Sequence, residues 1–309
     1  MIYEYRVYTA APGKMEALHH RFANVTLDLF ERHGLKVIGF WVPEGKEDEE
    51  LAYILAFDSE DRLYLADEQN QRITVFDKMG MYLSKWGVQG AAEGQLNGPS
   101  GLAFDAEDNL YVVDSRNHRV QKFNRNGSFI GAWGEMGDGP GQFNMPWGIS
   151  VGQDGTVYVA DWRNDRIQKF TAAGEYLGEI GSSGSGSGQF HRPTGVAVDK
   201  DGDIYVADWG NEQVQVLSPE GEVLARLRGD SIESKWANDY FLANPEEGAA
   251  RRAADLEPVM DPPTERNREE SANIEKLFWA PVSVILDDVG RVYVTEGNRH
   301  RIQVFERTS

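Results

Sequence analysis

The chain has 309 residues, no cysteine, 33 glycines and a formal net charge of −19. The absence of cysteine excludes a disulfide framework, a thiolate metal site and a cysteine nucleophile. The longest apolar run, LAYILAF at 51–57, is far shorter than the roughly 18 to 20 residues that a membrane-spanning helix needs. Glu4 and Arg6 stand where a secretory signal requires an apolar stretch, so we expect a soluble, cytoplasmic protein with no membrane partner.

The acid excess also bears on the class of partner. Binding to nucleic acid or to an anionic membrane depends on clustered Lys and Arg, so the net charge disfavours both in general. A local basic patch is compatible with this composition. The length permits one large domain or two smaller ones.

The first predicted elements form an α+β segment at residues 1–50. Tyr3, Tyr5 and Val7 alternate as on a strand, and VIGFW at 37–41 reads as another strand. Between them, apolar residues recur every three or four positions, as on one face of a helix: Met15, Leu18, Phe22, Val25 and Leu29.

The sequences MIYEYRVYTAAPGKMEALHHRF and ERHGLKVIGFW in this segment resemble the start of the NIPSNAP family. The resemblance covers about residues 1–60 and implies a ferredoxin-like, dimeric α/β-barrel type of module. The second half of such a module is absent, because the chain passes directly into AFDSEDRLYLAD. We expect this partial module to cover its open sheet edge by packing on the rest of the chain or on a second copy.

Four near-copies of one sequence follow, with a fifth near the C-terminus. Tyr64, Tyr111, Tyr158 and Tyr205 are each 47 residues apart. Tyr293 follows after 88 residues, which is one period of 47 plus 41 inserted residues. A period of this length is typical of repeat architectures.

Each copy predicts four short strands, which we call a to d. In the second copy these are GLAFD (101–105), LYVVD (110–114), RVQKF (119–123) and FIGAWG (129–134), separated by turn sequences. A four-stranded unit of this size cannot bury both of its faces alone and stacks on its neighbours around an axis. The sequence therefore predicts a mainly β, β-propeller domain over residues 51–309.

Residues 145–170, MPWGISVGQDGTVYVADWRNDRIQKF, and 192–217, RPTGVAVDKDGDIYVADWGNEQVQVL, resemble blades of the NHL-repeat family. The resemblance covers residues 51–309 apart from an insertion at 230–280. Two copies depart from the family pattern: Gln213 replaces an arginine in the fourth, while Glu296 and Arg299 replace an aspartate and an asparagine in the fifth. We expect weaker ties between blades at these places.

The number of blades and the closure of the ring stay open at this point. Five copies are recognisable, NHL propellers usually have six blades, and the fifth copy stops at Phe305 after strand c. Residues 35–42, LKVIGFWV, resemble the d strands and could complete the last blade. The alternatives are an incomplete ring and a first blade replaced by recombination.

The insertion at 230–280 predicts helices. Asp230 and Glu233 form a capping-box pattern at the start of a helix that Pro245 stops. Further helical segments are EEGAARRAADL and TERNREESANIEKLF. The insertion is either a lid or docking element, or a mobile acidic loop.

Charged residues that recur in the blades are interpreted as structural, because a residue needed at one chemical centre has no reason to recur in every blade. We expect the aspartate to accept backbone N–H bonds in the b–c loop, and the arginine to donate to nearby carboxylate or carbonyl groups. These residues are Asp67, Asp114, Asp161 and Asp208, with Arg72, Arg119 and Arg166.

Residues that do not recur on the loops are the better binding candidates. The d–a and b–c connections emerge on one face of a propeller, here called the loop face. Arginine and tryptophan are enriched where binding energy concentrates. The candidates are Gln69, Arg116, Trp162, Arg163, Trp209 and Arg299 in b–c loops, and Trp147, His191 and Arg192 in d–a loops. The alternative for Trp162 and Trp209 is simple packing between blades.

No metal site or other cofactor is expected. NHL propellers of the peptidylglycine amidating-lyase type use histidines that converge on zinc, but His118 and His300 occupy one equivalent position in separate blades and would not meet. The sequence DKDGD at 199–203 has calcium-loop character, yet it falls at an a–b turn, where a hairpin is the stronger interpretation.

The function that these patterns favour is a non-enzymatic binding scaffold for a protein or another polymer, acting through the loop face as a monomer or as a dimer through the N-terminal segment. One alternative is a propeller enzyme of the lyase or lactonase type, with a metal or an acid–base set in the channel. The other is an RNA-binding propeller with contacts from Arg116, Arg163, Arg192 and Arg299.

Overall fold

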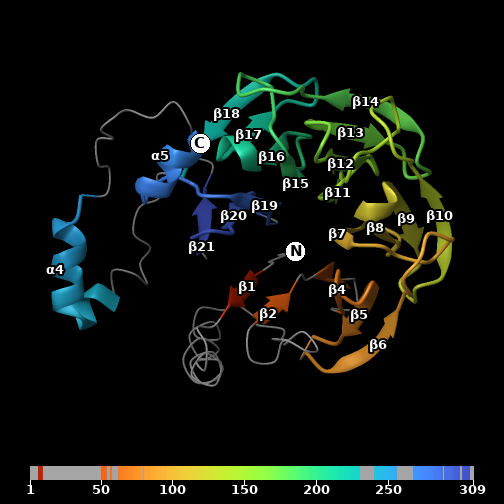
Figure 1. Ribbon diagram of the computed structural model, residues 1–309, viewed down its shortest axis with the longest axis horizontal. Helices are drawn as coiled ribbons and strands as arrows, with labels where there is room; N and C mark the ends of the chain where they lie inside the picture. Colours follow the sequence, from red (N-terminus) through yellow and green to blue (C-terminus); the bar gives the residue numbers. More distant parts are fainter. Residues whose placement is uncertain are drawn as a thin grey trace.

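The computed structural model shows a mainly β propeller of five blades arranged around a common axis (Figure 1). Each blade is an antiparallel sheet whose strands follow one another in chain order. This is the architecture that the repeats predict. The residues that the structure describes are 6–9, 50–53, 56–57, 62–78, 80–229, 240–255, 267–287, 289–299 and 301–306.

The first four blades each have strands a, b, c and d. The first contains β3 (Ala56–Phe57), β4 (Leu63–Asp67), β5 (Arg72–Phe76) and β6 (Tyr82–Trp86). The second contains β7 (Pro99–Phe104), β8 (Leu110–Asp114), β9 (Arg119–Phe123) and β10 (Phe129–Trp133). The third contains β11 (Ile149–Val151), β12 (Val157–Asp161), β13 (Arg166–Phe170) and β14 (Tyr176–Ile180). The fourth contains β15 (Pro193–Val198), β16 (Ile204–Asp208), β17 (Gln213–Leu217) and β18 (Val223–Leu227).

The core lies between adjacent blades. Strands β8, β12 and β16 are buried at every position, because neighbouring blades cover both faces of these sheets. One cluster, for example, combines Tyr64 and Ile73 of the first blade with Leu110 and Phe123 of the second. The d strands form the outer edge of the ring and are largely exposed.

The innermost strands of successive blades lie in close contact, and glycine makes this contact feasible. A Cβ atom on Gly148 would lie 2.5 Å from the carbonyl oxygen of Thr194 in the next blade. Gly195 has the same relationship to Ser283 of the fifth blade, at 3.0 Å from its Cα. Gly195 pairs with Ala207 across strands a and b of its blade. In the fifth blade the equivalent pair is Ser283 and Thr295, so the position of the glycine is taken by a serine. The small residue is thus glycine where the next blade packs tightly behind it.

The fifth blade has three strands among the described residues: β19 (Pro281–Leu286), β20 (Val292–Glu296) and β21 (Arg301–Phe305). A separate two-stranded sheet pairs β1 (Arg6–Thr9) with β2 (Glu50–Tyr53). In Figure 1 this sheet lies between the fifth blade and the first, and β2 contacts β4. The predicted closing strand at 35–42 and the predicted helix around 15–29 lie outside the described residues.

The described parts of the insertion include α4 (Pro245–Ala253), the short α5 (Asn267–Asn273) and a helical stretch at 240–243 that precedes Pro245. Pro245 is the first residue of α4, where its missing N–H costs nothing, so the proline that we expected to end one helix also begins the next. Residues 230–239 lie outside the described part. Of the helices described, none combines the length and the apolar character that crossing a membrane would require.

Candidate binding site on the loop face

The d–a and b–c loops lie against each other, so they share one face as predicted. The backbone N–H of Arg116 donates to the carbonyl of Asn97 at 3.0 Å, and that of Arg163 donates to Asn144 at 3.1 Å. Gly210 makes the equivalent bond to His191 at 2.7 Å. In each pair a b–c loop is bonded to the d–a loop that enters the same blade.

The recurring aspartates join these two loops. Asp161 is fully buried at the end of β12, and its Oδ1 accepts the backbone N–H of Asn144 at 2.8 Å. Its Oδ2 accepts hydrogen bonds from Asn164, Arg166 and Gln168. We expected the backbone donor to belong to the b–c loop, but it belongs to the d–a loop. Asp114 and Asp208 repeat this arrangement. Only Asp67 bonds the backbone of its own b–c loop, at Asn70.

The recurring arginines extend the same network. The Nε of Arg166 donates to Asp161 at 3.0 Å, and its Nη2 donates to the carbonyls of Gly139 and Gln142 in the preceding d–a loop. Arg119 does the same with Asp114 and three carbonyls, and Arg72 pairs with Asp67 at 3.0 Å. One guanidinium thus donates both to the recurring carboxylate and to backbone carbonyls of the d–a loop.

The departures from the repeat have unequal effects. Gln213 donates to Asp208 at 2.9 Å but is too short to reach the carbonyls that an arginine would bond, so the tie is weaker there, as expected. Glu296 keeps most of the pattern, because it accepts hydrogen bonds from the Trp279 N–H, from Arg301 and from Gln303. Arg299 donates to carbonyls of the insertion, so it adds a contact in place of the one lost.

A further set of hydrogen bonds, which link successive blades, was not predicted from the sequence. The residue just before strand c adopts a left-handed backbone and accepts a backbone N–H at the start of the next blade, 27 residues later in the first three blades. A sequence signal for these bonds exists: the residue type at this position varies between blades, but its side chain can always accept a hydrogen bond. The four described residues are Gln71, His118, Asp165 and Glu212.

The structure brings four of the predicted binding residues together. The rings of Trp147 and Trp162 lie 6.3 Å apart, and the guanidinium groups of Arg163 and Arg192 each lie 5.2 Å from the centre of the Trp162 ring. We call these four residues the Trp162 patch. Both arginines are exposed, and both tryptophans are half-buried. Within the described residues, neither guanidinium forms an ion pair or a hydrogen bond.

Three other candidates, His191, Arg116 and Gln69, are not covered by the described parts of the insertion and do not belong to this patch. His191 is exposed at its edge, with Nδ1 3.9 Å from Asp165. Arg116 lies apart, because it pairs with Glu68 of the first blade at 2.6 Å. Gln69 is exposed in that blade.

The insertion covers the remaining two candidates. Arg268 of α5 places its guanidinium 4.6 Å from the centre of the Trp209 ring. Arg299 lies over the ring of Trp279 and donates to the carbonyls of Ser271 and Ile274. In the described part of the chain, Trp209 and Arg299 are therefore engaged with the insertion.

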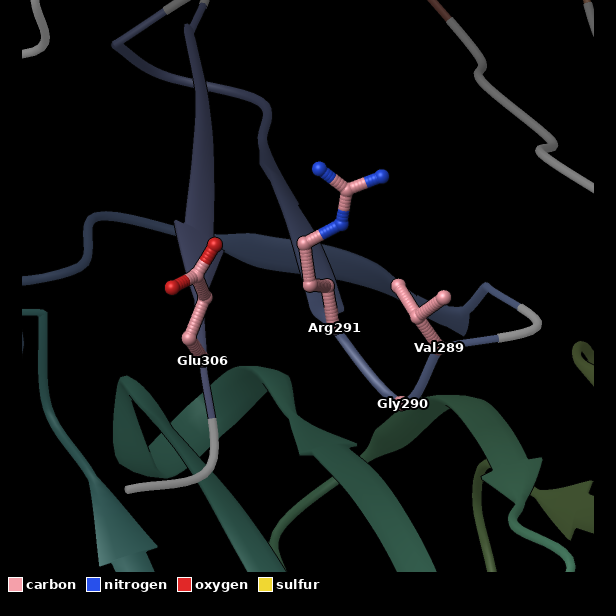
Figure 2. Close-up of a pocket in the computed structure, with 4 residues that line it drawn as sticks. All are labelled: Val289, Gly290, Arg291 and Glu306. Carbon is pink, nitrogen blue, oxygen red and sulfur yellow. The ribbon is translucent and has the colours of Figure 1, made fainter. Parts of the chain in front are cut away.

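A shallow hollow of about 360 Å³ lies on the fifth blade, at its a–b turn (Figure 2). Val289, Gly290, Arg291 and Glu306 line it. Arg291 is already paired with Asp287, Nε to Oδ2 at 2.6 Å. The guanidinium of Arg291, which lines this hollow, is thus already paired with a carboxylate of the same a–b turn.

The next question is whether the histidines considered for a metal site meet. His118 accepts the backbone N–H of Met145 through Nδ1 at 3.1 Å, which gives it a place in the inter-blade hydrogen bonds, whereas His300 lies outside the described residues. In the part of the chain that the structure describes, no three His, Cys, Asp or Glu side chains gather as a metal site would require.

Comparison with known families gives matches in both parts of the chain. Residues 96–123, 143–170 and 190–217 match the NHL repeat, and residues 3–66 match NIPSNAP. The chain therefore carries NHL repeats preceded by a NIPSNAP segment. The NIPSNAP match extends beyond residue 50 and includes β3 and most of β4, which are strands a and b of the first blade. A comparison with curated proteins gives no match.

Several solved structures share the fold. A chain of a nidogen/laminin complex is 16% identical with a TM-score of 0.53, over 82% of this chain and 74% of that one. Virginiamycin B lyase from Staphylococcus aureus is 10% identical with a TM-score of 0.52, over 100% of this chain and 90% of that one. An inactive variant of that lyase with quinupristin is 14% identical with a TM-score of 0.51, over 81% and 64%. At these identities the likeness shows the fold alone.

Proposed function

We propose that this protein is a non-enzymatic scaffold that binds a protein partner through its loop face, with the Trp162 patch at the centre of the contact. The observation that carries the proposal is the pair of exposed guanidinium groups of Arg163 and Arg192, each 5.2 Å from the centre of one indole and neither of them paired within the described residues. Arginine and tryptophan are the side chains that most often dominate binding energy at protein interfaces.

The chemistry of the patch favours an acidic segment as the partner. Stacking on Trp162 restricts the guanidinium groups of Arg163 and Arg192 before any partner arrives, so less side-chain entropy is lost on binding. A guanidinium binds a carboxylate through two parallel hydrogen bonds. The indole of Trp147 adds an apolar surface beside these cations. In a chain of net charge −19, such a cationic spot also orients an acidic partner toward this face.

The test is affinity capture from a nuclease-treated extract of the source cells, with the captured proteins identified by mass spectrometry. The double variant Trp162→Ala, Arg192→Ala removes the patch, and Leu177→Ala, an exposed apolar residue of strand d in the same blade, is the matched control. We expect the partner to be lost with the double variant and retained with the control.

Two outcomes would contradict the proposal. One is a set of captured proteins that the patch variant leaves unchanged. The other is capture that nuclease treatment abolishes, which would favour RNA, although Arg116 and Arg299 are paired elsewhere and only two of the four predicted RNA contacts remain available. The lyase or lactonase alternative is supported by likeness of fold only, and stoichiometric zinc or calcium in the purified protein would favour it.

A further inference from the structure

The side chain of Arg268 lies in a small site on the propeller that is built from two residues of the fourth blade. Its guanidinium is 4.6 Å from the centre of the Trp209 ring, and its Nη1 is 3.4 Å from Oε1 of Glu212. Arg268 belongs to α5 in the insertion, so 56 to 59 residues of chain separate it from these partners. The guanidinium therefore contacts an aromatic face and a carboxylate at once.

Glu212 is suited to bind a cation at this place. Its side chain is fully buried, and its Oε2 accepts the backbone N–H of Ala280. Its Oε1 accepts no hydrogen bond from the described residues, and its nearest described cation is Arg268. A buried carboxylate without a cation is strongly unfavourable. An indole face beside a carboxylate is also the combination that selects a planar guanidinium.

A second contact fixes the sequence that this site accepts. Glu270 lies two positions after Arg268 and forms an ion pair with Arg228 at 2.8 Å. Arg228 directly follows strand d of the fourth blade, at the start of a d–a connection, and its charge acts on Glu212. An arginine and a glutamate two residues apart thus meet a carboxylate and an arginine on the propeller.

Among the described residues, several buried polar atoms in and around α5 have no hydrogen-bond partner. In the third blade the Oε1 of Gln168 accepts the N–H of Gly141, but the Oε1 of the equivalent Gln303 accepts nothing from the described residues. A buried polar atom without a hydrogen-bond partner is unfavourable. These unsatisfied atoms favour displacement of α5 by a segment that bonds them better. The atoms concerned are Arg228 Nε, Ser271 Oγ, Arg299 Nε and Gln303 Oε1, and Glu212 Oε1 has its ion pair with Arg268 but no hydrogen bond.

We infer that Trp209, Glu212 and Arg228 form a binding site for an Arg-x-Glu segment of a partner protein, and that α5 occupies this site in cis. The partner segment displaces α5 by placing its arginine on Trp209 and its glutamate on Arg228. This site is separate from the Trp162 patch and does not depend on it. The loop face therefore has one open site and one site closed by the chain itself.

The test uses the full-length chain and a fluorescent peptide of residues 267–278, NREESANIEKLF, which is the cis occupant supplied in trans. The variant Arg268→Ala vacates the Trp209–Glu212 part of the site, and binding is followed by fluorescence polarisation. A peptide with alanine at the arginine position is the control ligand. We expect the Arg268→Ala chain to bind the native peptide at least about tenfold more tightly than the control peptide, and more tightly than the wild-type chain does.

Two further variants make the result decisive. Arg268→Gln keeps a polar side chain of similar length and should open the site in the same way if Arg268→Ala melts at a lower temperature. Adding Trp209→Ala to either variant should abolish the preference, whereas adding Trp162→Ala should not change it. The inference is overturned if the opened chain binds both peptides equally, or if the preference survives without Trp209. Failure of the Trp162 patch to capture a partner would leave this result unaffected.

Discussion

Glu212 accepts the backbone N–H of Ala280, 68 residues further along the chain, in the same way that Asp165 accepts the N–H of Arg192 27 residues further. The insertion lengthens the chain between the fourth and fifth blades but leaves this inter-blade hydrogen bond in place. The position before strand c is therefore a tie between blades that tolerates a different acceptor in each copy. It is also the position at which the stability of the ring can be tested one blade at a time.

The tie at His118 can be exchanged for another acceptor. His118→Gln should change the free energy of unfolding by less than about 1 kcal/mol, because Gln71 already makes the equivalent bond with the same left-handed backbone. His118→Leu should destabilise by about 1–3 kcal/mol, because it leaves the N–H of Met145 without its acceptor. Urea unfolding of the two variants measures the difference. Equal loss in both would show that the ring size of histidine matters, and not its acceptor.

Restoring the missing arginine in the fourth blade should stabilise the protein. In Gln213→Arg, the guanidinium can bond Asp208 and the carbonyls of Gly186 and Gln189, as Arg166 bonds Asp161, Gly139 and Gln142. We expect a gain of about 1–2 kcal/mol and a higher melting temperature. Gln213→Leu, which removes the bond to Asp208, is the opposing control and should destabilise. A gain absent from Gln213→Arg would mean that the d–a loop does not accept the side chain.

The same variant has a predicted pH dependence. Burial raises the pKa of Asp208 above the ordinary 3.8, and hydrogen bonds from Gln213 and His191 oppose this only in part. The folded state therefore binds the proton more readily than the unfolded state, and this carboxyl contributes less stability as the pH rises above 3.8. A guanidinium favours the charged form. The advantage of Gln213→Arg should thus grow between about pH 4 and about pH 7 and should not shrink over that range.

Glycine at the innermost strand is required by the close approach of the next blade. Gly148→Ala should destabilise by about 2–4 kcal/mol, because its Cβ would lie 2.5 Å from the carbonyl oxygen of Thr194. Gly131→Ala on an outer strand should change stability by less than about 1 kcal/mol, because nothing lies within 4 Å of its Cβ. Thermal unfolding distinguishes the two. A mild effect at Gly148 would mean that the blades separate easily.

Arg116 was a binding candidate that the structure places in an ion pair with Glu68, with about half of each side chain exposed. Exposed pairs of this kind contribute roughly 0–1 kcal/mol. Arg116→Ala should therefore leave both the unfolding free energy and partner capture nearly unchanged, whereas Arg192→Ala should weaken capture. Equal losses of capture with both variants would extend the contact surface beyond the Trp162 patch.

The sequence alone determined the repeating unit of this protein. A tyrosine every 47 residues sets the register, and the predicted strands at 110–114 and 119–123 coincide with β8 and β9. This is possible because a strand reveals itself by local alternation and because the repeat states the same pattern several times. The loop face follows from the same reasoning, since strand order fixes where each loop emerges.

Only the tertiary structure decided which loop residues meet. Trp162 and Trp209 stand at the same place in their repeats, yet one lies beside two exposed arginines and the other lies under Arg268 of the insertion. Apart from Arg163, which follows Trp162 in the same b–c loop, the neighbours of these tryptophans come from d–a segments whose sequence does not repeat. Contacts between such segments depend on how the blades stack in space. No local pattern in the sequence indicates which segments this stacking brings together.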